Sequence, residues 1–137
     1  YSSTDAGNLA NLYAGLCCAK QEKWNDAVNY LEAYSTGDDM MVSPMAVVAL
    51  GDAYAHLNQL DKAVEAFKKA AKMADSKAED NTNNSVSPNA LIKAGEILES
   101  QNKKDDALQI YQDIKKKYVN SPISQEIDKY IERASTK

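Results

Sequence analysis

The chain has 137 residues and a net charge of −4, from 16 basic and 20 acidic side chains. This length predicts one domain, and the mild acidic balance gives no general reason to expect nucleic acid or an anionic membrane surface as a partner. Glycine and proline are scarce, at 5 and 3 residues, and no run of about 18 apolar residues occurs, so the composition favours helices and excludes a membrane-spanning segment.

A pattern of small and large residues recurs three times along the chain. Gly15, Gly51 and Gly95 are each followed twelve residues later by an alanine, and then by a large apolar residue and a fourth matched position. These positions are Ala27, Leu31 and Tyr34, then Ala63, Phe67 and Ala70, then Ala107, Tyr111 and Ile114. Small residues let two helices approach closely, and a large residue one turn later fills the space beside the crossing. Each copy is therefore predicted to be a hairpin of two antiparallel helices.

Helix breakers and polar residues mark the turns of these hairpins. The turns are expected at residues 21–23, 57–59 and 101–103. Asn58 and Asn102 fall where a helix must end in a left-handed residue, a conformation that asparagine tolerates better than most other residues.

Three serine–proline pairs predict where three helices begin. They lie at residues 43–44, 87–88 and 121–122. In each pair the serine oxygen can accept a hydrogen bond from a free N–H as the N-cap, and proline at the first helical position has no N–H to leave unsatisfied. The last helix, expected at about 122–135, combines an apolar stripe with a charged face, as the end of a helical array requires.

The longest connection between copies is polar. Residues 75–87 contain no aromatic side chain and can bury little surface, which predicts a mobile surface loop. A functional loop is the alternative, although none of its residues argues for one.

These residues resemble the tetratricopeptide repeat family. The second copy, residues 50–54 followed by Ala63, Phe67 and Ala70, is similar to the family consensus, whereas the first carries Cys18 where a tyrosine is usual. The resemblance implies an all-α fold, a right-handed superhelix of three helical hairpins plus a C-terminal capping helix. It implies a single domain over residues 1–137. The expected repeats are at about 5–38, 44–78 and 88–120, and the capping helix is at about 122–135.

The end of the third copy, residues 117–122, is similar to bacterial cell-envelope members of the family. Within the family the chain most resembles membrane-anchored, translocon-associated repeat proteins of the Bacteroidetes type. This resemblance implies a soluble domain behind a membrane anchor in a bacterial cell envelope, with a cytoplasmic location as the alternative. Because the chain begins with Tyr1 and no leader precedes it, we expect a fragment or processed product without direct membrane contact of its own.

No catalytic constellation occurs in the sequence. His56 is the one histidine, so a serine nucleophile has no other imidazole as its base, and no glycine-rich phosphate loop is present. We therefore expect a protein that is not an enzyme and that needs no metal or cofactor. His56 is expected to face a groove or solvent, and Cys17 and Cys18 are expected to be small buried residues. The basic run 115–117 is expected to complement the carbonyl end of a helix, with nucleic acid or lipid contact as the alternative.

In the family, the first helices of the hairpins line a concave groove. The matching residues, counted from each glycine, are Leu9, Leu12, Leu16, Ala19 and Lys20, then Met45, Val48, Asp52, Ala55 and His56, then Asn89, Ile92, Glu96, Glu99 and Ser100. The groove is predicted to be apolar at its N-terminal side and acidic at its C-terminal side, which suits an extended or helical peptide. The alternative for Leu9, Leu12 and Leu16 is that they pack against further helices upstream.

The resemblance thus implies an interaction module or adaptor that binds a peptide or protein segment, and no nucleic acid. Some members bind a terminal carboxylate through a lysine and asparagine clamp, but the matching positions here are Leu12 and Leu16, so this ligand is disfavoured. Structural self-association as a homo-oligomer of a larger cell-envelope protein is the alternative.

Overall fold

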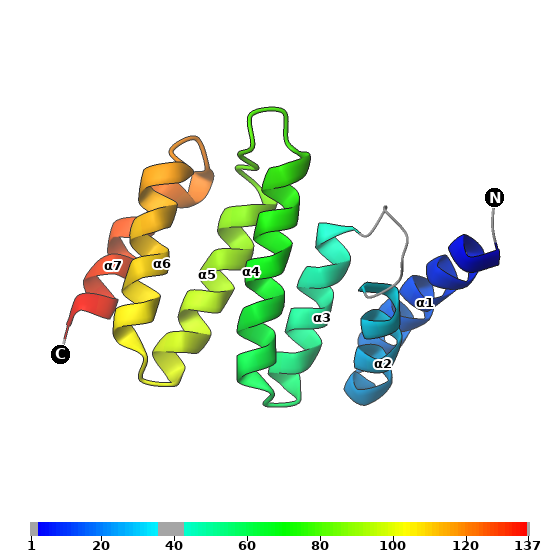
Figure 1. The fold of residues 1–137 in the computed structure, drawn as a ribbon. Helices are drawn as coiled ribbons and strands as arrows, with labels where there is room; N and C mark the ends of the chain where they lie inside the picture. Colours follow the sequence, from blue (N-terminus) through cyan, green and yellow to red (C-terminus); the bar gives the residue numbers. More distant parts are fainter. Residues whose placement is uncertain (1–2, 36–42, 137) are drawn as a thin grey trace. The chain divides into compact units, whose positions relative to one another are not determined.

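The computed structural model describes residues 3–35 and 43–136, and all of their regular structure is helical (Figure 1). Seven α-helices and one short 3₁₀ helix follow one another, and these two stretches contain no strand. They are α1 (Ser3–Lys20), α2 (Trp24–Ser35), α3 (Pro44–His56), α4 (Leu60–Lys77), α5 (Val86–Ser100), α6 (Lys104–Lys117), η1 (Pro122–Gln125) and α7 (Ile127–Ser135). The predicted all-α class, with three helical hairpins and a C-terminal helix, is confirmed.

The chain divides into two compact units, Tyr1–Ala66 and Phe67–Lys137, so the boundary falls within α4. The first unit contains α1, α2, α3 and the beginning of α4. The second contains the rest of α4 and all later helices. The expectation of one domain over residues 1–137 stays a prediction, and the expected end of the first repeat at residue 38 lies outside the described residues.

Three-residue turns join the helices of each hairpin where the sequence predicted them. Asn58 and Asn102 both have a φ of 59°, which confirms their left-handed conformation. Glu22 occupies the same position of the first turn with a φ of 60°. The sequence did not predict this conformation for Glu22, because a glutamate there costs roughly 1 kcal/mol more than a residue suited to it.

The same pair of backbone hydrogen bonds closes each turn and explains why Glu22 is held in this conformation. The amide after the left-handed residue donates to a carbonyl five residues back, and the amide of the left-handed residue donates to a carbonyl three residues back. The longer-range bonds are Lys23 N to Cys18 O at 2.8 Å, Gln59 N to Tyr54 O at 2.9 Å and Lys103 N to Leu98 O at 2.8 Å. This is the Schellman motif, which satisfies carbonyl groups that a helix end would otherwise leave free.

Glycines lie at the helix crossings, as the repeating pattern predicted. A Cβ atom built on Gly15 would lie 2.7 Å from Leu31 Cγ, and one built on Gly95 would lie 2.8 Å from Tyr111 Cζ. Carbon atoms pack at about 3.5–4.0 Å, so neither crossing has room for a larger residue. The matched residues are core residues in all three copies: Ala27, Leu31, Tyr34, Ala63, Phe67, Ala70, Ala107, Tyr111 and Ile114 are buried.

The three serine–proline pairs differ in how well they marked the starts of helices. Ser43 is the N-cap of α3, as predicted, although its side chain makes no capping hydrogen bond. Ser121 Oγ accepts a hydrogen bond from the Ile123 amide at 3.2 Å, but it begins the short η1, and α7 begins only at Ile127. The prediction of one continuous helix from residue 122 is therefore wrong in its first turn.

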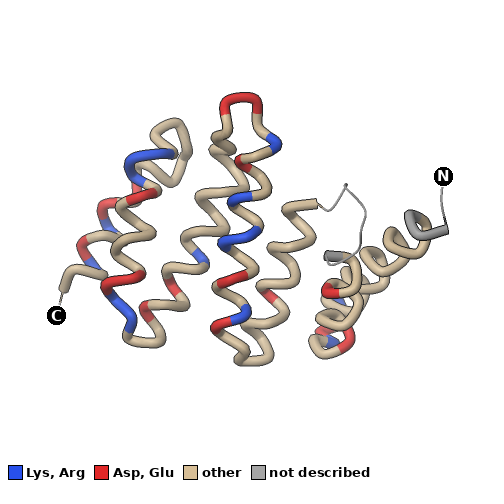
Figure 2. Tube along the Cα trace, viewed as in Figure 1, with Lys and Arg blue, Asp and Glu red and all other residues tan. Residues whose placement is uncertain are grey.

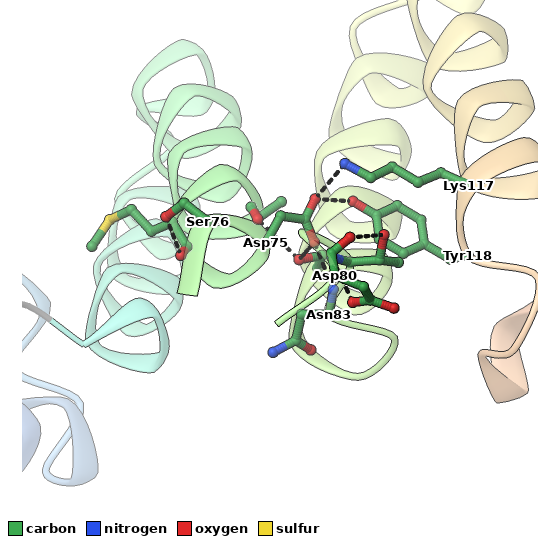
Figure 3. Close-up of polar contacts among 10 residues, drawn as sticks. Asp75, Ser76, Asp80, Asn83, Lys117 and Tyr118 are labelled. Carbon is green, nitrogen blue, oxygen red and sulfur yellow. Dashed lines mark hydrogen bonds and ion pairs between the residues drawn. The ribbon is translucent and has the colours of Figure 1, made fainter. Parts of the chain in front are cut away.

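Asp75, near the end of α4, joins four segments of the second unit (Figure 3). Its carboxylate accepts hydrogen bonds from the Asn83 amide at 2.8 Å, the Ser87 hydroxyl at 2.7 Å and the Tyr118 hydroxyl at 2.5 Å. Lys117 Nζ completes the set with an ion pair at 3.0 Å. We call these five residues the Asp75 cluster. It ties the end of α4 to the following loop, to α5 and to the end of α6.

The Asp75 cluster corrects two predictions about residues 75–87. Ser87 is not an N-cap, because α5 begins at Val86 and the Ser87 side chain is buried against Asp75 and the Ala71 carbonyl oxygen, 2.9 Å away. Asn83 serves the start of α5 instead, since its side-chain oxygen accepts from the Val86 amide at 2.8 Å. The expected surface loop is therefore shorter than predicted, because both of its ends belong to the core.

Electrostatics favours the ionised form of Asp75. Burial raises the pKa of this carboxyl, but the hydrogen bonds from Asn83, Tyr118 and Ser87 and the Lys117 ammonium more than offset burial, so its pKa lies below the ordinary value of 3.8. Burial and the adjacent carboxylate raise the pKa of Tyr118 well above its ordinary value, which keeps the hydroxyl as the donor.

A second polar group fixes α7 to the preceding hairpin. Arg133 binds the Glu99 carboxylate in a bidentate manner, with Nε at 2.9 Å and Nη2 at 2.6 Å from its oxygens. The Tyr111 hydroxyl donates to the same carboxylate at 2.5 Å, and the Tyr111 ring lies 5.4 Å from that of Tyr130. Bidentate arginine–carboxylate pairs combine strength with a defined direction, so they hold α7 in one orientation.

The glycine crossing predicts the effect of one methyl group. Gly95→Ala should lower the free energy of unfolding by about 2 kcal/mol, because the new Cβ overlaps the Tyr111 ring. Combining it with Tyr111→Ala should cost less than the sum of the two single changes. Gly7→Ala is the control, since its Cβ would meet nothing within 4 Å, and it should raise stability by roughly 0.5–1 kcal/mol. Urea titration measures the free energy of unfolding of the three single variants and the double variant. Additive effects of Gly95→Ala and Tyr111→Ala would contradict the close contact between these two residues.

The Asp75 cluster predicts a pH-dependent contribution to stability. Asp75→Asn should cost about 2–3 kcal/mol at pH 7, because an amide cannot replace the carboxylate toward these donors. A carboxyl with a depressed folded-state pKa contributes stability above its ordinary pKa of 3.8 and loses it as the pH falls through the lower folded value.

The difference between wild type and Asp75→Asn should therefore shrink below pH 3.8. Asp80→Asn, in the exposed loop, is the matched control and should change stability by less than about 0.5 kcal/mol at pH 7. Urea titrations from pH 7 to pH 3 give the comparison, and a constant difference across this range would refute the assigned role of the carboxylate.

Candidate protein-binding surface

One side of α1 is apolar and lies open to solvent. Leu9, Tyr13 and Leu16 are 48%, 63% and 40% exposed. Their spacing of four and three residues places them on one face of the helix. Residues 6–19 carry no charged side chain, and Figure 2 shows this helix almost without colour for charge. We call Leu9, Tyr13 and Leu16 the α1 apolar face.

α1 has this open face because its opposite side is used for folding. Gly15 lies on that side, buried against Leu31 of α2, and Asn8 is buried about two turns before it. Leu12 is half-buried at the edge between the two sides. The predicted groove residues Leu9 and Leu16 are thus accessible, and Leu12 is so only in part.

α3 continues the first unit beside α1 and carries the next five predicted residues, of which Ala55 is half-buried. Met45 is 59% exposed, Val48 and Asp52 are half-buried, and His56 is exposed. The His56 ring stacks on Trp24 with centroids 4.0 Å apart and an angle of 1° between the planes. His56 therefore faces solvent, as expected, but its ring has a defined position at the start of α2.

Sequence reasoning missed Tyr13, the most exposed member of the α1 apolar face. The groove positions were counted from the glycine by the family pattern, which passes over this residue. Helical spacing alone could have found it, because Tyr13 lies four residues after Leu9 and three before Leu16. Lys20, also predicted for the groove, is exposed at the end of the same helix.

The five predicted residues of α5 lie in the second unit, and Ser100 at the end of this helix is exposed. Asn89 and Glu96 are exposed, whereas Ile92 is only 6% exposed and belongs to the core. Glu99 is half-buried and already bound by Arg133. The Arg133 hydrogen bond lowers the pKa of Glu99, against the opposing effect of burial. The charge of Glu99 is thus satisfied within the protein, which leaves Glu96 as the accessible acid among the five.

The adjacent cysteines do not share one environment. Cys17 is exposed and Cys18 is half-buried, so the prediction that both are buried is wrong. Neighbouring residues on a helix point about 100° apart, and this rotation turns Cys17 outward beside Leu16.

Within the described residues no group of three or more histidine, cysteine, aspartate or glutamate side chains could hold a metal ion. None of the described helices combines the length and apolar character needed to cross a membrane.

Exposed apolar side chains gathered on one face are a recognised sign of a protein interaction site, whereas scattered ones are ordinary. Leu9, Tyr13 and Leu16 share one helix face, and α3, which carries the exposed Met45, is in contact with α1. The first unit therefore offers an apolar surface that is uncharged over residues 6–19 of α1, with Lys20 as an exposed charge at the end of the same helix.

A family model described as tetratricopeptide repeat matches residues 19–78 and 49–122 of the chain. The two matches together cover well over half of the sequence, so the chain belongs to the tetratricopeptide repeat family. Repeats of this family are generally protein-interaction modules and are typically non-catalytic. No curated protein matches the chain.

Proposed function

We propose that this protein is a non-catalytic adaptor that binds a peptide or protein segment on the surface formed by α1 and α3. The observation that carries the proposal is the α1 apolar face, where three large side chains are 40–63% exposed on one side of an uncharged helix. Met45 of α3, a helix in contact with α1, is as exposed as these residues. Membership of a family of interaction modules supports the same class of function.

The geometry favours a helical partner segment with apolar side chains at helical spacing. Leu9, Tyr13 and Leu16 form a ridge along α1, and helix surfaces pack by placing the ridge of one into the groove of another. Covering such side chains contributes roughly 25 cal/mol for each Å² of apolar surface removed from water. The affinity would come from these side chains, because residues 6–19 offer no charge to a partner.

The side chains around the apolar surface would set the orientation of the segment. Lys20 is exposed at the C-terminal end of α1, and Asp52 is half-buried on α3. Charges at the rim of an interface affect orientation and association rate more than affinity. For the location of this adaptor we propose the bacterial cell envelope, supported by the resemblance of residues 117–122 to cell-envelope members of the family.

Self-association is the second candidate, because the same face could bind its own copy. A two-fold dimer places identical patches against each other, and an uncharged patch can meet itself without electrostatic repulsion. Light scattering separates the two candidates. A measured mass that stays at the monomer value at all protein concentrations supports the adaptor. A mass that rises to the dimer value as the protein concentration increases, and that stays at the monomer value in Tyr13→Glu, supports self-association.

Peptide selection tests the adaptor directly. A phage-displayed library of random peptides should yield binders with apolar residues three and four positions apart. Tyr13→Glu and Leu16→Glu should each weaken the best selected peptide by about tenfold or more, since each removes an apolar contact and buries a charge. Binding is measured by isothermal titration calorimetry.

Tyr30→Glu is the matched control for Tyr13→Glu, because Tyr30 is a tyrosine of α2 that is 42% exposed in the same unit. It should change the affinity by less than about twofold, a difference far below the 1.4 kcal/mol that a tenfold change represents. Circular dichroism confirms that each variant keeps its helices. If Tyr13→Glu and Leu16→Glu bind the selected peptides as wild type does, the α1 apolar face is not the binding site.

A further inference from the structure

A groove in the second unit lies between α6 and α7. It has a volume of about 600 Å³ and is lined by Gln112, Lys115, Lys116, Val119 and Ile131. We call it the α6–α7 groove. Its volume lies in the range of pockets that hold small ligands or a few amino-acid side chains. It belongs entirely to the second unit, so it is distinct from the α1 apolar face.

The floor of the α6–α7 groove is apolar and fixed in position. Val119 is 62% exposed, and Ile131 of α7 is half-buried beside it. The residue before Val119 is Tyr118, which is buried with its hydroxyl bound to Asp75 at 2.5 Å. Because Tyr118 is held inward by Asp75, the side chain of Val119 is directed outward. Its position is fixed by the buried Tyr118 and not by contacts of Val119 itself.

The rim of the groove is basic. Among the three consecutive lysines at the end of α6, Lys117 pairs with Asp75 at 3.0 Å and Lys115 pairs with Asp128 at 2.8 Å. Lys116 lines the groove and has no ion-pair partner within residues 3–35 and 43–136. No acidic residue is among the lining side chains, and Figure 2 shows the basic end of α6. A bound acid would therefore meet the Lys116 ammonium, and next to it the Lys115 ammonium with its Asp128 partner, which is not itself among the lining residues.

We propose that the α6–α7 groove binds a short acidic peptide segment with one apolar side chain, which contacts Val119 and Ile131 while a carboxylate of the segment pairs with Lys116. The chemistry follows from the combination of an apolar floor and a basic rim. A nucleic acid would gain nothing from the apolar floor, and no aromatic side chain lines the groove to stack on a base. A membrane surface needs a larger apolar area and more basic residues than this groove supplies.

Fluorescence anisotropy with labelled peptides tests the proposal on the whole chain. The probe is a labelled peptide of the sequence Glu-Glu-Leu-Glu-Glu, and its matched controls replace leucine by serine or all four glutamates by lysine. The acidic leucine peptide should bind at least about tenfold more tightly than either control, because each control removes one of the two complementary features. Its affinity should fall as the salt concentration rises, as screening requires.

Two substitutions locate the binding. Val119→Asp and Lys116→Glu should each weaken the acidic leucine peptide by about tenfold. Lys129→Glu is the matched control for charge, since Lys129 is an exposed lysine of α7 that does not line the groove, and it should change affinity by about twofold at most.

Three results would overturn the proposal: no binding at millimolar peptide, equal binding of the serine peptide, or unchanged binding in both groove variants. Tighter binding of a single-stranded oligonucleotide or of anionic vesicles than of the peptide, lost in Lys116→Glu, would also overturn it. Because Tyr13→Glu should leave this peptide's affinity unchanged, failure here is distinguishable from failure of the adaptor function.

Discussion

The rest of the structure depends on the close approach of two helices at a glycine. At Gly15 and Gly95 the large side chain of the second helix lies where a Cβ would otherwise be, against Leu31 and Tyr111. This contact sets which side of each first helix is buried, and thereby which side is left for solvent. In α1 the crossing uses the side of Gly15, so Leu9, Tyr13 and Leu16 lie on the open side. One side of α1 therefore packs against α2, and another side of the same helix is the candidate binding surface.

Hydrogen bonds and ion pairs fix the relative orientation of neighbouring helices, which apolar packing alone does not define. The Asp75 carboxylate receives donors from the loop, α5 and α6, and the Glu99 carboxylate receives Arg133 from α7 and Tyr111 from α6. Buried carboxylates are stable in a protein only when their acceptor sites are filled, so each fixes the elements that donate to it. The Asp75 cluster also directs Val119 outward through its neighbour Tyr118, which links a core interaction to the α6–α7 groove.

Much of this fold could be predicted from the sequence, because the small and large residues that repeat along the chain are the residues that meet at the helix crossings. The three turns followed from the helix breakers and polar residues that interrupt the apolar pattern, and the left-handed Asn58 and Asn102 followed from their places at helix ends. Glu22 was missed because the Schellman hydrogen bonds impose a conformation that its side chain does not favour. Ser87 was misassigned because a serine before a proline reads locally as a cap, whereas the deciding partner, Asp75, is twelve residues away. Of the candidate site, the groove pattern of the family gave the accessible Leu9 and Leu16, but it also gave Ile92, whose burial depends on tertiary packing that no local pattern contains.

The central claim is that the open side of α1 binds a protein segment. The most direct measurement is a nuclear magnetic resonance titration of the isotope-labelled chain with a peptide selected for binding. The account predicts that chemical shifts change on α1 and α3, centred on Leu9, Tyr13, Leu16 and Met45, while α6 and α7 keep their signals. Shift changes confined to the second unit, or a saturated complex in which the α1 signals do not move, would contradict it.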